Sequence, residues 1–427
     1  MPVNEQGPLS GFRDMLAEQM IPRQRMIDSI KNVYEMYGFV PLDTPAIERY
    51  ETLTGKYGAE GEKLMYQFTD NGGRHIALRY DLTVPLARVA YQHKDKISLP
   101  YKRYQIGNVW RGDSPQAGRY REFMQFDADT VGTTSVIADA EIVEMISDAM
   151  ESLGVRAIVR VNNRGILDGL AQTAGITDEK KARGLVGIID KAEKIGKEAV
   201  ILEVRNSFDE STTNLVASYL NISGDDRAKL GQIKNIMGNS EAAKKGIDDL
   251  EQGFAILRAA CYDSDKVIFD QTIARGLYYY TGIIYETTLI DLPEIGSVCS
   301  GGRYDKLVAA LSDGKVDLPA VGTSVGVDRL FTALQQLGKL VPAKTLSQVL
   351  VANFNSSDAP QYMVVASLLR KSGIRTEVYY DPDKLAKQMK YADKQGIPYI
   401  IFLGSEEIEN GIVKRCELDK KAAVRAF

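Results

Sequence analysis

The chain has 427 residues, of which 44% are hydrophobic and 26% are charged, as is usual for soluble globular proteins. At roughly 150 residues per domain, this length predicts about two or three domains. A formal net charge of −4 excludes a globally basic nucleic-acid-binding surface, and no apolar run approaches the ~20 residues of a membrane helix.

The cysteines and histidines limit the chemistry that the chain can carry. Cys261, Cys299 and Cys416 lie far apart and form no CxxC pair, so neither a disulfide framework nor a zinc site is expected. The only two histidines, His75 and His93, are too few for a histidine-rich metal site or a catalytic triad. The opening "MPVNEQGPLS" lacks a signal pattern, and we therefore expect a cytoplasmic protein.

The first part of the chain predicts a helix and then antiparallel strands. Apolar residues recur at helical spacing in "EQMIPRQRMIDSIKNVYEMYGF", which ends at the helix-stopping Gly38. A further helix is expected near Thr83, whose hydroxyl could cap it. "YKRYQIGNVWR" and "RYREFMQFDAD" predict two strands joined by the loop "GDSPQAG".

The later segments predict an interrupted core followed by a separate domain. Residues 165–263 are mainly helical in pattern and indicate an inserted module, which leaves 1–164 and 264–336 as the core. After a linker at 337–346, strands and helices alternate over 347–427, as in parallel βαβ units. The expected fold is thus an α+β antiparallel core with a helical insertion and a C-terminal α/β domain.

One face of the strand predicted at residues 119–129 changes from cationic to anionic. Residues two apart share a face of a strand. That face holds Arg119, Arg121, Phe123, Gln125, Asp127 and Asp129. It could bind a ligand that is anionic at one end and basic at the other. A solvated edge strand with scattered charges is the alternative.

Several quoted segments resemble a known family. "GNVWRGDSPQAGRYREFMQFDAD" is similar to motif 2 of class II aminoacyl-tRNA synthetases, in the form used by histidyl-tRNA synthetases. "ARGLYYYTGIIYE" and "SGGRYD" resemble the two signature peptides of that family, and "AVGTSVGVDRL" and "YGFVPLDTPAIE" resemble motifs 3 and 1. The resemblance covers nearly the whole chain and implies a class II catalytic core with a C-terminal anticodon-binding domain.

The resemblance implies a histidine–tRNA ligase. Such an enzyme joins L-histidine and ATP into histidyl-adenylate with release of pyrophosphate, Mg²⁺ accompanying the ATP phosphates. It then transfers histidine to the 3′ end of histidine tRNA, and it works as a homodimer through the motif 1 region. Because the attacking carboxylate is already ionised, alignment and charge stabilisation by arginines suffice without a general base. The alternative is the non-catalytic, synthetase-like regulatory subunit of ATP phosphoribosyltransferase, which lacks the C-terminal domain.

The motif positions assign roles to individual residues. The resemblance implies Arg275 and Arg111 as catalytic residues and Gln116 as a tRNA contact. It implies ATP binding by Arg111, Asp113, Arg119, Arg121, Phe123 and Arg329. It implies histidine binding by Asp81, Thr83, Gln125, Asp129, Arg275, Tyr279 and Tyr280. No protein ligands for a metal are assigned.

Several of these residues also have structural interpretations. A lone strand arginine is usually an ion pair, strand tyrosines usually pack, and Asp81 could simply be a helix N-terminal acid. Tyr278 stands where the family usually has Asp. Arg121 to Asp129 would span about 26 Å at ~3.3 Å per residue, so a bend or bulge is expected between Gln125 and Asp129, or contact by only one aspartate. Glycines at 301, 302, 322 and 326 are expected to let the backbone approach a ligand.

Overall fold

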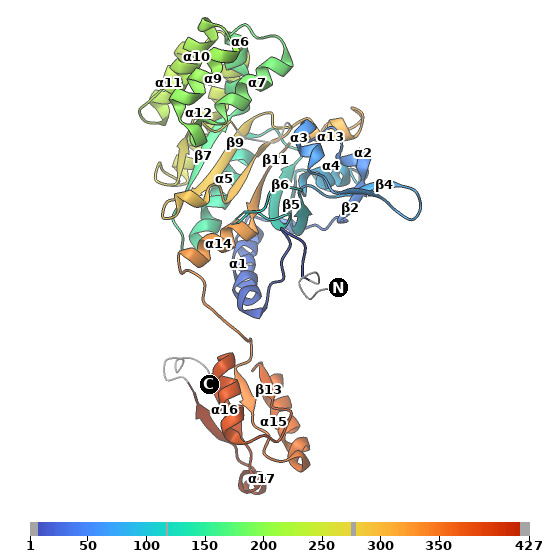
Figure 1. Cartoon of the computed structure of the whole chain (residues 1–427). Helices are drawn as coiled ribbons and strands as arrows, with labels where there is room; N and C mark the ends of the chain where they lie inside the picture. Colours follow the sequence, from blue (N-terminus) through green and yellow to red (C-terminus); the bar gives the residue numbers. More distant parts are fainter. Residues whose placement is uncertain (1–6, 117, 275–278, 419–427) are drawn as a thin grey trace. The chain divides into compact units, whose positions relative to one another are not determined.

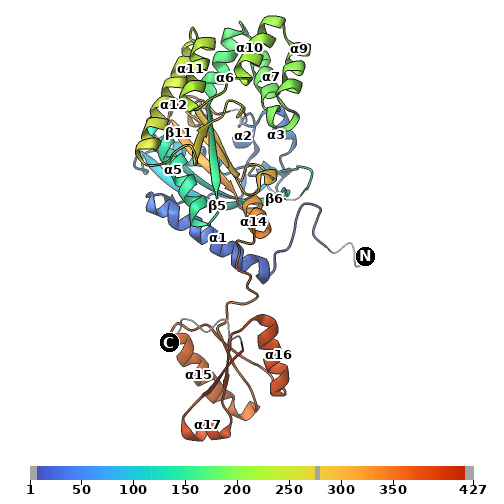
Figure 2. The same cartoon turned by 90° about the vertical axis from the view of Figure 1, so that its left-hand side faces the viewer.

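The structure is a computed structural model that describes residues 7–116, 118–274 and 279–418 (Figures 1 and 2). It divides into two compact units. Unit 1 holds the chain up to Arg13 together with Ile27–Lys339, and unit 2 holds Asp14–Met26 together with the chain from Leu340 onward.

Unit 1 is built on a large, mainly antiparallel sheet. In the described residues the strand order is β1-β5-β6-β11-β10-β9-β7-β8, and only the outer pairs β1/β5 and β7/β8 are parallel. The strands are β1 (Val40–Pro41), β5 (Tyr101–Trp110), β6 (Glu122–Val131), β7 (Ala157–Asn163), β8 (Val267–Phe269), β9 (Ile283–Leu289), β10 (Cys299–Arg303) and β11 (Ala320–Gly326). The predicted antiparallel core is confirmed.

Strands β5 and β6 pair without interruption. Their register runs from Tyr101 opposite Val131 to Trp110 opposite Glu122, and β6 pairs equally regularly with β11 on its other side. This register excludes a bulge between Gln125 and Asp129, which was one of the expected alternatives, because an extra residue in this central strand would break two hydrogen-bonded ladders. Arg119 and Arg121 precede β6 and lie in the loop.

Helices and a small second sheet complete the core of unit 1. The helices are α2 (Tyr50–Leu53), α3 (Gly58–Lys63), α4 (Thr83–Gln92), α5 (Val136–Ser152), α13 (Leu307–Leu311) and α14 (Val327–Gln336), and α1 spans Ala17–Met36. The small antiparallel sheet has the order β2 (Ile47–Arg49), β4 (His75–Leu78), β3 (Gln67–Thr69). We had expected that the Thr83 hydroxyl could cap α4, but it does not. The cap position is Leu82, and the Asp81 carboxylate accepts the Val84 N–H at 3.0 Å.

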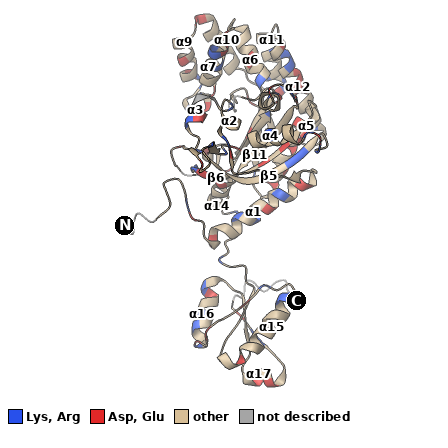
Figure 3. Cartoon of the chain, turned by 90° about the vertical axis from the view of Figure 1, so that its right-hand side faces the viewer, with Lys and Arg blue, Asp and Glu red and all other residues tan. Residues whose placement is uncertain are grey.

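Seven consecutive helices follow β7 and form what we call the helical insertion. They are α6 (Arg164–Thr173), α7 (Glu179–Ile189), α8 (Ala192–Ile195), α9 (Lys197–Ser207), α10 (Glu210–Leu220), α11 (Asp226–Met237) and α12 (Glu241–Ala259). Five of them begin at a capping side chain that accepts a backbone N–H; the capping residues are Asn163, Asp178, Asp209, Asp225 and Ser240. Figure 3 shows basic and acidic residues interspersed along these helices.

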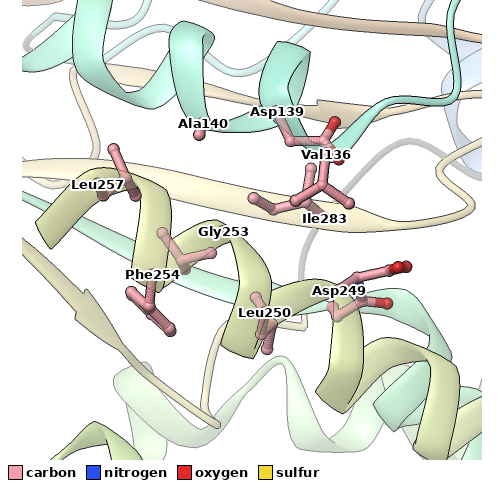
Figure 4. Close-up of a pocket in the computed structure, with 11 residues that line it drawn as sticks. Val136, Asp139, Ala140, Asp249, Leu250, Gly253, Phe254, Leu257 and Ile283 are labelled. Atoms are coloured by element: carbon pink, nitrogen blue, oxygen red, sulfur yellow. The ribbon is translucent and has the colours of Figure 1, made fainter. Parts of the chain in front are cut away.

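Helix α12 packs against α5 and β7 and thereby ties the insertion to the sheet. A void of about 10 Å³ remains between α5 and α12, lined mainly by apolar side chains such as Leu250, Phe254 and Ile283 (Figure 4). It has room for about one water molecule, so it is a packing feature and not a ligand site.

The described part of unit 2 contains a four-stranded sheet of its own. The order is β13 (Thr376–Val378), β12 (Val349–Val351), β14 (Tyr399–Phe402), β15 (Lys414–Glu417), and all neighbours are parallel except β14/β15. Helices α15 (Ala359–Lys371), α16 (Leu385–Gln395) and α17 (Ser405–Asn410) connect the strands. The predicted parallel βαβ pattern is confirmed. The closing strand β15 was not recognised in the sequence.

A search of the described residues for a helix both long and apolar enough to cross a membrane found none.

Candidate active site

A cavity of about 450 Å³ opens beside β6 in unit 1. Its walls come from the β5–β6 loop, β6, β10, β11, the start of α14 and the helical insertion. Six of the residues singled out in the sequence line it: Arg111, Asp113, Arg119, Phe123, Gln125 and Arg329. Its volume lies in the range of small-molecule sites, and three guanidinium groups favour an anionic ligand.

Arg111 is held at the cavity wall by aromatic rings. Its guanidinium carbon lies 4.3 Å from the centroid of Tyr80 and 5.2 Å from that of Phe123, and its Nε donates to the Tyr80 carbonyl oxygen at 3.0 Å. Among the described residues no carboxylate forms an ion pair with it. A fixed cation that lacks a carboxylate partner is suited to a ligand phosphate.

The other arginines are held differently. Arg119 pairs with Asp113 at 2.8 Å and its side chain remains 47% exposed. Arg329 Nη1 donates to the Ser297 carbonyl oxygen at 2.7 Å. Arg121 does not line the cavity, since its guanidinium donates to the backbone carbonyls of Asp113 and Ser10, each at 3.2 Å. Its role in ATP binding stays a prediction.

The Asp81 carboxylate lies in a hydrogen-bonded group with two other predicted histidine-binding residues, Tyr279 and Thr83. It accepts hydrogen bonds from Tyr57 Oη at 3.0 Å and from Tyr279 Oη at 3.3 Å, and Tyr279 is also hydrogen-bonded to the Thr83 side chain. Burial raises the pKa of Asp81, whereas the Val84 N–H and the Arg111 guanidinium act in the opposite direction. Asp81 is thus both a helix N-terminal acid and a member of a polar cluster near Arg111.

Asp129 is committed to protein partners. Arg103 Nη2 lies 2.7 Å from its Oδ2, and the Tyr304 hydroxyl donates to its Oδ1. Asp129 is 2% exposed and does not line the cavity. Burial raises its pKa, and Arg103 opposes that shift. Contact between Asp129 and an imidazole stays a prediction.

Aromatic rings connect these two carboxyl groups. Tyr279 packs edge-on against Tyr280 and Tyr304, with centroid separations of 5.2 and 5.7 Å. Tyr279 binds Asp81, and Tyr304 binds Asp129. Arg275 and Tyr278 lie outside the described residues. Gln116 exchanges backbone hydrogen bonds with Arg119 in the loop, at 3.0 and 2.9 Å.

Most of the glycines near the site make room for protein atoms. A Cβ at Gly322 would lie 1.8 Å from Asp129 Oδ1, and one at Gly301 would lie 2.1 Å from the Gly322 carbonyl oxygen. A Cβ at Gly302 would meet the Ile283 carbonyl oxygen at 2.5 Å. The expectation of ligand approach is therefore replaced at these three positions by close packing within the sheet. Gly326 does line the cavity.

Sequence reasoning missed several residues of the site. Arg103 and Tyr304 hold Asp129, Ser324 binds Gln125, and Asp190 and Lys194 of the helical insertion line the cavity. Only the pairing register could have revealed Arg103 and Ser324, because each lies in a strand next to β6.

Comparison with known proteins agrees with this arrangement. A family model described as histidyl-tRNA synthetase matches residues 11–330, and one described as an anticodon binding domain matches residues 348–426. A histidine–tRNA ligase from Rhodopirellula baltica is 44% identical over 409 residues, covering 95% of this chain and 92% of its own length. One from Wolinella succinogenes is 40% identical over 415 residues, covering 95% and 92%.

A solved structure extends the similarity to three dimensions. The crystal structure of histidyl-tRNA synthetase from Nostoc sp. PCC 7120 matches with a TM-score of 0.83 and 32% identity over 97% of each chain. The large sheet of unit 1, which carries the arginine-lined cavity, therefore has the fold of a class II aminoacyl-tRNA synthetase. The chain belongs to the histidyl-tRNA synthetase family.

Proposed function

We propose that the chain is a histidine–tRNA ligase that forms histidyl-adenylate from L-histidine and ATP and then transfers histidine to histidine tRNA. The carrying observation is that Arg111, Arg119 and Arg329 share one cavity with Phe123 and Gln125. Three cations suit a triphosphate, an aromatic ring suits a base, and an amide suits the amino acid.

In the first step the histidine carboxylate attacks the α-phosphorus of ATP, and pyrophosphate leaves. We assign Arg111 to the α-phosphate, because aromatic faces fix its guanidinium without neutralising it. Arg119 and Arg329 take the outer phosphates, and Phe123 takes the adenine, with Asp113 nearby. Arg275 would neutralise both the substrate carboxylate and the α-phosphate. Catalysis then consists of alignment and stabilisation of phosphate charge.

Histidine recognition is assigned to the polar residues next to this cavity. Asp81, Thr83 and Tyr279 form one hydrogen-bonded group that suits an α-ammonium group. Neutral imidazole has one donor and one acceptor nitrogen. In our proposal Asp129 and Tyr280 serve the two ring nitrogens, and Gln125 provides a further amide contact.

The second step requires tRNA. Gln116, in the β5–β6 loop, would contact the acceptor end. Unit 2 would bind the anticodon, and residues 370–394 carry five lysines and two arginines suited to phosphates. We also propose residues 165–263 as the inserted domain, 337–346 as linker and 347–427 as the anticodon-binding domain.

In this proposal Mg²⁺ binds together with ATP, on the phosphate groups. Among the described residues no group of three or more His, Cys, Asp or Glu side chains is arranged to hold a metal ion. The carboxylate of Asp113 lines the cavity and supplies the oxygen chemistry that Mg²⁺ prefers. Bound Mg²⁺ would neutralise charge on the phosphate oxygens.

We further propose a homodimer through the motif 1 region, residues 37–48. The β2–β4–β3 sheet exposes Ile47 and Phe68, which are 46% and 44% accessible, beside a groove of about 580 Å³. Sedimentation of the Ile47→Asp variant tests this surface. A monomer is expected, and an unchanged dimer would place the interface elsewhere.

ATP–pyrophosphate exchange tests the function directly. Histidine should drive exchange, and the other standard amino acids should not. Complete absence of exchange under all conditions would favour the regulatory-subunit alternative. The match to an anticodon-binding domain over residues 348–426 supports the ligase.

For Arg275→Ala we expect the rate of adenylate formation to fall far more than histidine affinity.

A further inference from the structure

We infer that Asp127, a buried carboxyl group outside the cavity, orients the side-chain amide of Gln125 through the hydroxyl group of Ser324. Asp127 and Ser324 would thereby decide that Gln125 presents its carbonyl oxygen, and not its NH₂ group, to the amino acid substrate. The inference rests on the proposed function, because it concerns the positioning of one predicted histidine-binding residue.

The three side chains form a continuous hydrogen-bonded series across two strands. Gln125 and Asp127 lie two residues apart in β6 and share a face of the sheet. Ser324 of β11 stands directly opposite Asp127. Gln125 Nε2 donates to Ser324 Oγ at 2.9 Å, and the Ser324 hydroxyl, opposite Asp127 in the strand pair, lowers the pKa of the Asp127 carboxyl group as a hydrogen-bond donor.

Counting protons gives this series a direction. A serine hydroxyl has one proton, and Asp127, which is ionised once the pH exceeds its pKa of about 7, can then only accept. The Ser324 proton is therefore directed to Asp127, and Ser324 Oγ can only accept from Gln125. Only the amide nitrogen of Gln125 satisfies that requirement. Without Asp127, the Ser324 hydroxyl could donate to the amide oxygen and the amide could turn over.

The orientation leaves one polar atom unsatisfied. Gln125 Oε1 is buried and has no hydrogen-bond partner among the described residues, although Gln125 lines the cavity. Buried polar atoms are nearly always hydrogen-bonded, so an unpartnered acceptor at a cavity wall indicates a ligand donor. The ammonium group or an imidazole N–H of the substrate has that chemistry.

The surroundings of Asp127 bear on its ability to accept. It is 1% exposed, and Arg103, fully buried in β5, favours its charged form. Burial and the neighbouring Asp129 and Asp81 favour the neutral form. Because Asp127 does not itself line the cavity, it is a positioning residue that acts through Ser324.

A double-mutant cycle tests the inference in the full-length protein. At about pH 8, where Asp127 is ionised, we would measure the KM values of histidine and ATP in pyrophosphate exchange for wild type, Asp127→Ala, Ser324→Ala and the double variant. Each single change should raise the histidine KM about tenfold and change the ATP KM less than about twofold. The histidine KM of the double variant should be no higher than that of the single variant with the higher KM, because both changes break the same hydrogen-bonded series. Asp127→Asn, whose Oδ1 can accept from Ser324, should recover most of the histidine affinity.

Thr130→Val is the matched control. Thr130 is a buried polar residue of the same strand, on the opposite face from Asp127, and its substitution should leave both KM values unchanged. Additive effects in the cycle, or equal rises in both KM values, would overturn the inference. If Asp127→Ala does not fold, an unchanged histidine KM in Ser324→Ala is sufficient to overturn it. A wild type without histidine-dependent exchange would instead contradict the proposed function.

Discussion

The two ends of the β5–β6 hairpin use arginine in opposite ways. At the loop end, Arg111 is held between aromatic rings, and the Arg119 side chain is 47% exposed beside Asp113. Eight residues before Arg111 on the same hairpin, the Arg103 side chain is fully buried and pairs with Asp129. In our proposal arginine binds a ligand at the end that water can enter, and at the buried end it stabilises the fold.

This difference follows from the cost of burying charge. An ion taken out of water must recover its lost hydration from a nearby partner, so Arg103 and Asp129 are present together. An arginine at an open cavity keeps part of its hydration, so it needs no buried carboxylate partner and is available to bind an anionic substrate. Substitutions at the buried end should therefore mainly reduce stability, and those at the loop end should mainly reduce activity.

The largest effect is expected for Arg103→Met. It leaves Asp129 and Asp127 buried without their shared cation, and the free energy of unfolding should fall by roughly 3–5 kcal/mol. Urea unfolding measures the change. Arg156→Ala, which removes an exposed ion pair with Asp291, is the control and should leave the free energy of unfolding close to that of wild type. Equal losses would mean that burial does not distinguish the two sites.

Arg111→Ala should act on activity instead. If Arg111 contacts the α-phosphate as proposed, loss of this fixed cation should lower the maximal rate of histidine-dependent pyrophosphate exchange about 10²- to 10³-fold. The urea midpoint should stay close to that of wild type, because no described carboxylate depends on Arg111 for an ion pair. A large loss of stability would place Arg111 with the structural arginines.

Asp127→Asn sharpens the comparison through pH. Burial raises the pKa of Asp127 to about 7, so the folded protein keeps a proton that the unfolded chain releases near pH 4. The contribution of this group to stability is present at low pH and is lost as the pH rises through about 7. The Asn variant stays neutral and should gain roughly 4 kcal/mol relative to wild type between pH 4 and pH 8. Parallel pH profiles of the two proteins in urea unfolding would contradict this.

The smallest effect is expected for Gly322→Ala. The added Cβ would meet Asp129 Oδ1 at 1.8 Å, and the repacking should cost about 1–3 kcal/mol. Gly326→Ala in the same strand is the matched control, because its nearest neighbour atom would lie at 3.7 Å. The melting temperature should fall for the first variant only. If both fall equally, helix or strand preference and not the clash is responsible.

The sequence alone indicated the larger features of this protein. Alternating and helical hydrophobic patterns predicted the antiparallel core, the run of helices between β7 and β8, and the parallel sheet of unit 2. The motif segments identified Arg111, Phe123, Gln125 and Arg329, which the structure brings to one cavity. Such features are local in the chain, so the spacing of residues records them directly.

Other features were decided only by the tertiary structure. Arg119 and Arg121 lie two positions apart in the sequence, but only Arg119 lines the cavity. Backbone carbonyl groups hold the Arg121 side chain elsewhere. Tyr304 reaches Asp129 from 175 positions away, and Arg103 meets it only because β5 and β6 pair in one particular register. Strand pairing joins residues that are distant in the chain, and the balance of burial and charge among them has no counterpart in local spacing.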